Sequence, residues 1–304
     1  MSWLVADFGF SAAAADWQGL PAIRLTLPGG DSALVALQGA QVLSWVSGGK
    51  EQLFLSPHAA HDGHAPIRGG IPVCFPQFNQ RGPLVKHGFA RTLAWQARAD
   101  DARIDGDGLR LALRLEDNAA TRAVWPQSFA AELNVWLQPA ALTVALAVRN
   151  TGMVALAFTA ALHTYLRVDD VAATTLSGLQ GLRYWDAVAD THPLQEGEVR
   201  FGPELDRVYP RPAQPMALHT GGAPGLRITQ DAGWADTVVW NPGAALCARL
   251  ADMPADGHAH MLCVEAAAID APVVLVPQAH WQAAQRLERL GAASQAGQGL
   301  ASAC

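Results

Sequence analysis

The sequence predicts an all-β fold, a large antiparallel β-sandwich with few short helices. Apolar or alternating segments short enough to be strands recur along the chain, and turn-forming residues separate them about every ten residues. No segment combines helical periodicity over a convincing length with capping residues at both ends. Strands that follow one another closely favour antiparallel pairing, because parallel strands need a long crossover connection.

Four strands are expected near the N-terminus, between Ala22 and Pro57. The first three are AIRLTL, SALVAL and QVLSWVS, which alternate or run apolar, and PGGD forms the turn between the first two. The fourth is EQLFLSP, which ends at Pro57 because proline removes a backbone hydrogen-bond donor.

Three histidines, His58, His61 and His64, follow at regular spacing in the loop HAAHDGHAP. One interpretation is a metal site. The alternative is an exposed loop of Gly, Asp and Pro that happens to contain histidines. No cysteine or paired carboxylate completes a ligand set, so we expect no metal.

The segment from Arg68 to Arg91, RGGIPVCFPQFNQRGPLVKHGFAR, is neither a helix nor a regular central strand, because three prolines interrupt it. Gly69 and Gly70 allow a tight turn or a close approach to a ligand. An apolar run, Ile71 to Phe75, lies between two basic ends. The basic and imidazole side chains are Arg68, Arg81, Lys86, His87 and Arg91. This pattern indicates either a pocket wall with cationic rims or a buried loop whose arginines bind carbonyl groups.

The rest of the chain continues the pattern of short strands separated by turns. Residues 109–125, LRLALRLEDNAATRAVW, are also compatible with a partly helical structure. The expected strands lie within residues 93–101, 109–117, 129–138, 141–150, 155–168, 178–187, 197–210, 225–230, 236–242 and 260–269.

No stretch of low complexity divides the chain, so we expect one domain over residues 1–290. The 304 residues are 50% hydrophobic, which is enough to bury a large core. The last residues, 291–304, are small and polar, and we expect them to be disordered.

The charge pattern argues against nucleic acid or an anionic membrane as the partner. The formal net charge is -6, and no basic stripe is present. A few local cations still permit an anionic small-molecule substrate. The chain has no C-x-x-C spacing among its four cysteines, no basic start typical of a secretory signal, and no apolar run of about 18 residues. We therefore expect a cytoplasmic monomer with free thiols.

Three segments place a lone polar group inside apolar sequence: His163 in AALHTYLRV, Glu265 in MLCVEAAAI and Asp206 in ELDRVYP. A carboxylate buried on a strand is costly unless partners stabilise it, so such groups are either structurally paired or poised for proton transfer. No G-x-S-x-G elbow, P-loop or dinucleotide fingerprint is present. The remaining interpretation is acid–base chemistry by a histidine and a glutamate near arginines.

Six motifs occur in order along the chain: RGGIPVCFPQF, KHGFAR, LHTYLRV, DRVY, VVWNP and CVEAAAI. Their order and spacing resemble those of the glucose-6-phosphate 1-epimerases (hexose-6-phosphate mutarotases), a branch of the aldose 1-epimerase superfamily. The resemblance extends from Ile23 to Arg286. It implies a large antiparallel β-sandwich, in agreement with the strand pattern.

The resemblance also implies roles for individual residues. His163 and Glu265 match the catalytic pair, and Asp206 matches the acidic residue that binds sugar hydroxyls. The remaining matches are to substrate-binding positions: Arg68 and Arg91 to the cations that hold the sugar phosphate, and His87 to a histidine beside the ring. Lys86 occupies a position that is often Gln in the family, and it either adds charge to the phosphate site or points to solvent.

The implied reaction is anomer exchange of a hexose 6-phosphate, with D-glucose 6-phosphate as the expected substrate. Glu265 would take the proton of the anomeric hydroxyl while His163 protonates the ring oxygen, so we expect Glu265 ionised and His163 protonated at rest. The open aldehyde would rotate about C1–C2 and close on the other face, with no cofactor or metal. The alternatives are an aldose 1-epimerase that acts on unphosphorylated sugar and a non-catalytic carbohydrate-binding protein. A glycosidase lacks support, because nothing fixes the separation of a second carboxylate.

Overall fold

We analysed a computed structural model of the chain, which describes residues 5–221 and 223–291. Three antiparallel sheets account for most of this structure. The all-β prediction is therefore confirmed. The predicted disordered tail, 291–304, lies outside the described residues except for Gly291.

The first sheet has six strands in sequence order and is built from the N-terminal part of the chain. Its first long hairpin turns at Gln18 and Gly19, and both have the positive φ that a two-residue type I′ turn requires. The strands are β1 (Val5–Asp7), β2 (Phe10–Trp17), β3 (Leu20–Thr26), β4 (Ser32–Ala36), β5 (Val42–Ser47) and β6 (Lys50–Glu51).

The second sheet has nine strands in the order β16-β14-β18-β19-β22-β11-β10-β9-β8. In β10, FAAELNVWLQ, buried and half-buried residues alternate strictly, because one face packs on the core. The strands are β8 (Ala102–Asp105), β9 (Gly108–Glu116), β10 (Phe129–Gln138), β11 (Ala141–Asn150), β14 (Thr174–Ser177), β16 (Val199–Arg200), β18 (Met216–Thr220), β19 (Ala223–Gln230) and β22 (His280–Arg289).

The third sheet has seven strands in the order β15-β17-β20-β21-β12-β7, with β13 also paired to β21. The first nine residues of β21 are all buried, so this part of the strand is covered on both faces. The strands are β7 (Val73–Cys74), β12 (Leu156–Leu162), β13 (Tyr165–Arg167), β15 (Trp185–Asp186), β17 (Leu205–Pro210), β20 (Asp236–Asn241) and β21 (Met261–Leu275).

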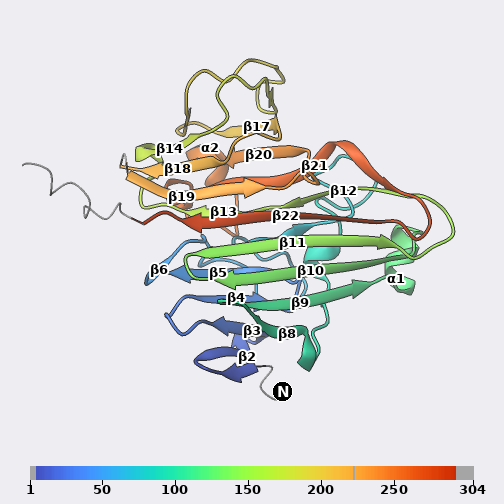
Figure 1. Ribbon diagram of the computed structural model, residues 1–304. Coiled ribbons are helices and arrows are strands. Elements are labelled where there is room, and N and C mark those ends of the chain that lie inside the picture. Colours follow the sequence, from blue (N-terminus) through green and yellow to red (C-terminus); the bar gives the residue numbers. More distant parts are fainter. Residues whose placement is uncertain (1–4, 222, 292–304) are drawn as a thin grey trace, which may run out of the picture.

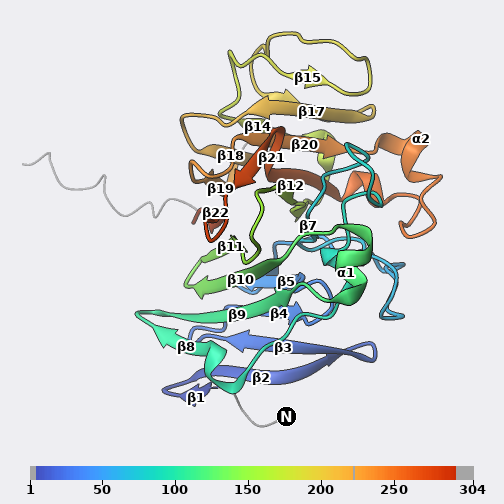
Figure 2. The ribbon, with the colours of Figure 1, turned by 90° about the vertical axis from the view of Figure 1, so that its right-hand side faces the viewer.

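The three sheets form two layers of a sandwich. Figure 1 shows the nine-stranded sheet facing the viewer with the other two sheets behind it, and Figure 2 shows the two layers side by side. Isolated bridges, such as Val42 to Ile71 and Leu53 to Leu166, link the six-stranded to the seven-stranded sheet within one layer. Buried apolar side chains from all three sheets form one large cluster between the layers.

The helices of the described residues are short. Asn118 caps α1 by accepting hydrogen bonds from the backbone N–H groups of Ala120 and Thr121, so the helical alternative for residues 109–125 is correct for its last part. None of the described helices has the length and apolar composition needed to span a membrane. The α-helices are α1 (Ala119–Val124) and α2 (Gly243–Cys247), and the 3-10 helices are Ala90–Thr92, Ala99–Asp101, Val171–Ala173 and Gly257–Ala259.

Several predicted strands are wrong or incomplete. Residues 93–101 form two isolated bridges followed by the 3-10 helix Ala99–Asp101, most of 51–57 forms isolated bridges, and residues 178–187 contribute only β15. Conversely, β2 and β22 were not predicted from the sequence. Their segments, FSAAAADW and HWQAAQRLER, are rich in alanine or polar residues with low strand propensity, and pairing with long neighbours holds them in the sheets.

Candidate active site

A pocket of about 330 Å³ opens on the seven-stranded sheet, a size suited to a small molecule. Its walls come from the segment 66–91, from the break between β12 and β13, and from β17, β20 and β21. All seven site residues predicted from the sequence line it: Arg68, Lys86, His87, Arg91, His163, Asp206 and Glu265.

His163 lies in the break between β12, which ends at Leu162, and β13, which begins at Tyr165. Its backbone N–H donates to the carbonyl of Pro72 at 2.9 Å, and that of Tyr165 donates to the carbonyl of Gly70 at 2.9 Å. The Gly-Gly-Ile-Pro segment therefore supports the break. Gly70 has a φ of +62°, and a Cβ there would lie 2.1 Å from the carbonyl oxygen of Val42, so only glycine fits.

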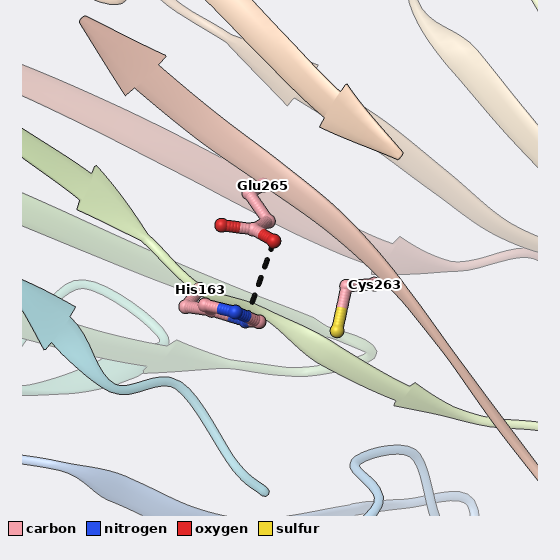
Figure 3. A group of neighbouring side chains, drawn as sticks. All are labelled: His163, Cys263 and Glu265. Carbon is pink, nitrogen blue, oxygen red and sulfur yellow. Dashed lines mark ion pairs between the residues drawn. The ribbon is translucent and has the colours of Figure 1, made fainter. Parts of the chain in front are cut away.

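Glu265 approaches His163 from β21. The Nδ1 atom of His163 lies 3.4 Å from the Oε1 atom of Glu265, and the Glu265 side chain is 1% exposed (Figure 3). The contact is close enough for an ion pair but is not aligned as a hydrogen bond. Neither His163 Nδ1 nor Glu265 Oε2 has a hydrogen-bond partner within the described part of the chain. Two buried polar atoms are thus left without a hydrogen bond, which is rare in native structures.

Burial dominates the protonation of this pair. It lowers the pKa of His163 well below its usual range, and the charges of Arg68 and Arg91 lower it further. Burial likewise raises the pKa of Glu265 well above its usual range; Asp206 adds to this effect and Lys86 opposes it. The protein's own groups therefore favour a neutral imidazole beside a carboxylic acid. Both directions run against the expectation of a resting ion pair, because burial disfavours the charged form of each partner.

Aromatic rings fix the orientation of His163. Tyr165 stacks on it with ring centroids 4.7 Å apart and an angle of 10° between the planes. Trp240 and His87 pack edge-on against it, at 6.0 Å and 5.4 Å. The imidazole is therefore held in one plane beside Glu265.

His87 is held as a neutral ring. Burial, and then the charges of Arg91 and Lys86, lower its pKa to about 3. Its Nδ1 accepts the backbone N–H of Asn79 at 3.3 Å and lies 3.2 Å from the Cys74 thiol. With Nδ1 as the acceptor, the proton is on Nε2, which makes His87 a donor toward the pocket.

The predicted cations differ in how many hydrogen bonds they already make with the rest of the protein. Arg68 donates to Asp252 at 3.0 Å and to the hydroxyl of Tyr165 at 3.0 Å. Burial lowers the pKa of Arg68, but Tyr165 and Asp252 outweigh it and raise the pKa overall. Arg91 makes one bond, from Nη2 to the carbonyl of Lys86 at 2.8 Å, and its buried Nε has no partner among the described residues. Arg91 and the exposed Lys86 are therefore the more available cations.

Asp206 projects from β17 into the same pocket. Burial, and then the neighbouring charge of Glu204, raise the pKa of Asp206 to about 6, although Lys86 acts in the opposite sense. A carboxyl group with this pKa is mostly ionised at neutral pH and can accept hydrogen bonds from hydroxyl groups, as a sugar would require.

Sequence reasoning missed Tyr165, Trp240 and Asp252 as parts of the pocket. Tyr165 could have been found, because residues two apart on extended chain share a face and His163 precedes it by two. Asp252 gave no signal, since its partner Arg68 is 184 positions away in the sequence.

The sandwich defines a galactose mutarotase-like fold, and its pocket contains the His163/Glu265 pair. The chain belongs to the aldose 1-epimerase family, which it matches over residues 21–288. The resemblance seen in the motifs is thereby confirmed.

Individual relatives point to one branch of this family. A protein from Cenchrus ciliaris is 33% identical over 257 residues, covering 82% of this chain and 78% of its own length. A protein from Escherichia coli K12 is 35% identical over 238 residues, covering 76% and 78%. Both are named "Putative glucose-6-phosphate 1-epimerase". A crystal structure from Salmonella typhimurium, named as a "putative mutarotase", superposes with a TM-score of 0.83 at 30% identity, covering 91% of this chain and 93% of the other.

Proposed function

We propose that this protein interconverts the α and β anomers of a hexose 6-phosphate, with D-glucose 6-phosphate as the substrate. The observation that carries the proposal is the buried pair of His163 and Glu265, whose unpartnered polar atoms share one pocket with Lys86 and Arg91. The names of the relatives from Cenchrus ciliaris and Escherichia coli support the same substrate.

Anomer exchange needs one group that gives a proton and one that takes a proton. The acceptor removes the proton of the anomeric hydroxyl, the C1–O1 bond becomes a carbonyl, and the C1–O5 bond breaks with its electrons moving to O5. The donor protonates O5. Rotation about C1–C2 and the reverse proton transfers then close the ring on the other face, so the pair returns to its starting state.

The His163/Glu265 pair carries one transferable proton in either of its forms. In the neutral form that burial favours, Glu265 is the donor and His163 the acceptor. Transfer of that proton gives an imidazolium and a carboxylate with the roles exchanged. This conversion only moves a proton within the pair and so needs no net proton from solvent, but it requires Nδ1 and Oε1, now 3.4 Å apart, to come into hydrogen-bond alignment. The exchange in both directions can therefore use the same two side chains.

The cationic side chains in the pocket are the reason for proposing a phosphorylated substrate. Arg91 offers a guanidinium whose buried Nε has no partner among the described residues, and Lys86 adds an exposed charge to the pocket lining. A guanidinium fork matches phosphate oxygens in a bidentate manner. Arg68 contributes mainly by holding the hydroxyl of Tyr165, whose ring stacks on His163. A phosphate bound at Arg91 would orient the sugar ring over the acid–base pair.

An aldose 1-epimerase for unphosphorylated sugar is the second candidate, since Asp206 and His87 can bind hydroxyl groups without any phosphate. The availability of Arg91 and Lys86 favours the phosphorylated substrate. A non-catalytic binding protein is disfavoured, because simple binding needs no unpartnered carboxyl group beside an imidazole.

Saturation-transfer NMR of the anomeric protons tests the proposal. Exchange of glucose 6-phosphate should be accelerated far more than that of glucose or galactose at equal concentrations. Equal acceleration of glucose would favour the second candidate, and no acceleration of any sugar would refute catalysis.

We further propose that the chain acts on this small molecule as a cytoplasmic monomer with one domain over residues 1–290. In support of a single domain, one apolar cluster contains residues of all three sheets. Analytical ultracentrifugation tests the monomer: a single species of about 32 kDa is expected, and a dimer would contradict it.

A further inference from the structure

Cys263 lies beside the acid–base pair but has no role in the proposed reaction. It precedes Glu265 by two positions on β21, so strand alternation directs both side chains to the same face of the sheet. One ligand atom from each of His163, Cys263 and Glu265 lies within 4.8 Å of the others (Figure 3). All three are buried.

These donors form a set that suits zinc. Imidazole nitrogen, thiolate sulfur and carboxylate oxygen are its usual protein ligands, and the sulfur disfavours Mg²⁺ and Ca²⁺. In a tetrahedral site with bonds of about 2.0–2.3 Å, neighbouring ligand atoms are about 3.3–3.8 Å apart. The measured limit of 4.8 Å is thus within a small side-chain adjustment of that geometry.

Two further observations indicate that the set can close on a cation. His163 Nδ1 and Glu265 Oε2 are buried without a hydrogen-bond partner within the described residues, so no existing bond must be broken. The charges also balance, because a divalent ion with one thiolate, one carboxylate and a neutral imidazole has no net charge. A neutral cluster avoids most of the cost of placing an ion in a buried site.

We propose that His163, Cys263 and Glu265 form an inhibitory site for Zn²⁺. Binding releases two protons to solvent, one from the Cys263 thiol and one from the His163/Glu265 pair. The ion then occupies both groups needed for proton transfer and leaves a fourth position for water. Inhibition rests on the proposed function, whereas metal binding does not.

Cobalt(II) provides a readout that is independent of catalysis, since it takes the place of Zn²⁺ and its bond to a thiolate absorbs in the near ultraviolet. The titration uses a Cys304→Ser background, which removes a thiol outside the described residues. We expect one equivalent of Co²⁺ to produce the charge-transfer band.

Cys263→Ala should abolish the band, and Cys247→Ala should retain it. Cys247 is the matched control because it is a buried thiol in the same apolar cluster as Cys263. A band that survives Cys263→Ala would overturn the site.

Inhibition is tested with the same variants and with Cys263→Ser, which keeps the side-chain volume. Anomer exchange without metal should be unchanged in all three, because Cys263 touches no reacting atom in the proposed reaction. The Zn²⁺ concentration for half inhibition should rise at least tenfold in the Cys263 variants and stay constant in Cys247→Ala. Equal inhibition of all variants would contradict the proposal. If the native chain shows no anomer exchange while the cobalt band appears, the metal site stands and the proposed function fails.

Discussion

The two sides of the break between β12 and β13 are both largely buried but differ in their hydrogen bonding. On the side of the sheet that faces the core, the Thr164 hydroxyl donates to Gln285 Oε1 at 2.6 Å, and Gln285 Nε2 donates to the carbonyl of Val264 at 2.9 Å. On the pocket side, His163 Nδ1 and Glu265 Oε2 lack hydrogen-bond partners among the described residues.

This difference separates structural from functional polar groups. A buried polar group without a partner costs about 1–3 kcal/mol, so a protein retains one where something else requires it. The Thr164–Gln285 network stabilises the contact between the two layers of the sandwich. The His163/Glu265 pair bears a stability cost, and we infer that it is retained for proton transfer.

The largest expected effect comes from removing the unpartnered groups. His163→Ala and Glu265→Gln should each lower kcat for glucose 6-phosphate exchange by about 10²–10⁴-fold, because each removes one partner of the proton transfer. Saturation-transfer NMR gives the rates. Urea unfolding is the control, and Glu265→Gln should be at least as stable as the native chain. Full rates in both variants would contradict the assignment of the pair.

The next largest effect is expected from Arg91, whose Nε has no hydrogen-bond partner among the described residues. Arg91→Ala should raise the KM for glucose 6-phosphate about tenfold to a hundredfold, because one charge-assisted hydrogen bond is worth about 1.5–3 kcal/mol. The KM for free glucose should change little. Arg227→Ala, which removes an exposed arginine paired with Glu288, is the control and should leave both values unchanged. An equal rise in KM for both sugars would contradict the proposal that Arg91 binds the phosphate.

A substitution on the core-facing side, where the polar groups are hydrogen-bonded, should affect stability instead of catalysis. Thr164→Val keeps the shape of the side chain but leaves Gln285 Oε1 without its donor, so unfolding should become easier by about 1–3 kcal/mol. Urea denaturation measures this loss. We expect kcat to stay within about tenfold of the native value. A loss of activity as large as that of Glu265→Gln would erase the distinction between the two sides.

The smallest effect is a pH-dependent gain in stability. Because the folded-state pKa of Asp206 is about 6 against a usual 3.8, the folded form binds its proton more tightly, and stability falls as the pH rises through this interval. Asp206→Asn should therefore be more stable than the native chain by about 1–2 kcal/mol above pH 6, and the gain should vanish below pH 4. Thermal unfolding across this range checks it, and a gain that does not depend on pH would contradict the cause.

The sequence predicted the fold well wherever burial and strand alternation coincide. The segment FAAELNVWLQ was predicted as a strand and is β10, with one face buried throughout. Polar β22 was missed because it depends on pairing with β11, which is distant in sequence. Alanine-rich β2 was missed because its residues have low strand propensity, although it pairs with the adjacent β3. Local propensity contains no information about such pairing.

The residues of the candidate site were predictable from the sequence, but their pKa shifts and hydrogen-bond partners were not. His163 and Glu265 stood out as lone polar groups in apolar sequence, and the family motifs paired them. The lowered pKa of His163 and the raised pKa of Glu265 both depend on burial, which only the packed sheets produce. The unequal availability of Arg68 and Arg91 depends on Asp252, which comes from a distant loop.

A crystal structure with glucose 6-phosphate tests the central claim most directly. We predict that the ring oxygen and the anomeric hydroxyl lie within hydrogen-bond distance of His163 and Glu265, filling their unpartnered positions, while the phosphate contacts Arg91. A sugar bound with its phosphate at the pair, or outside this pocket, would contradict the account.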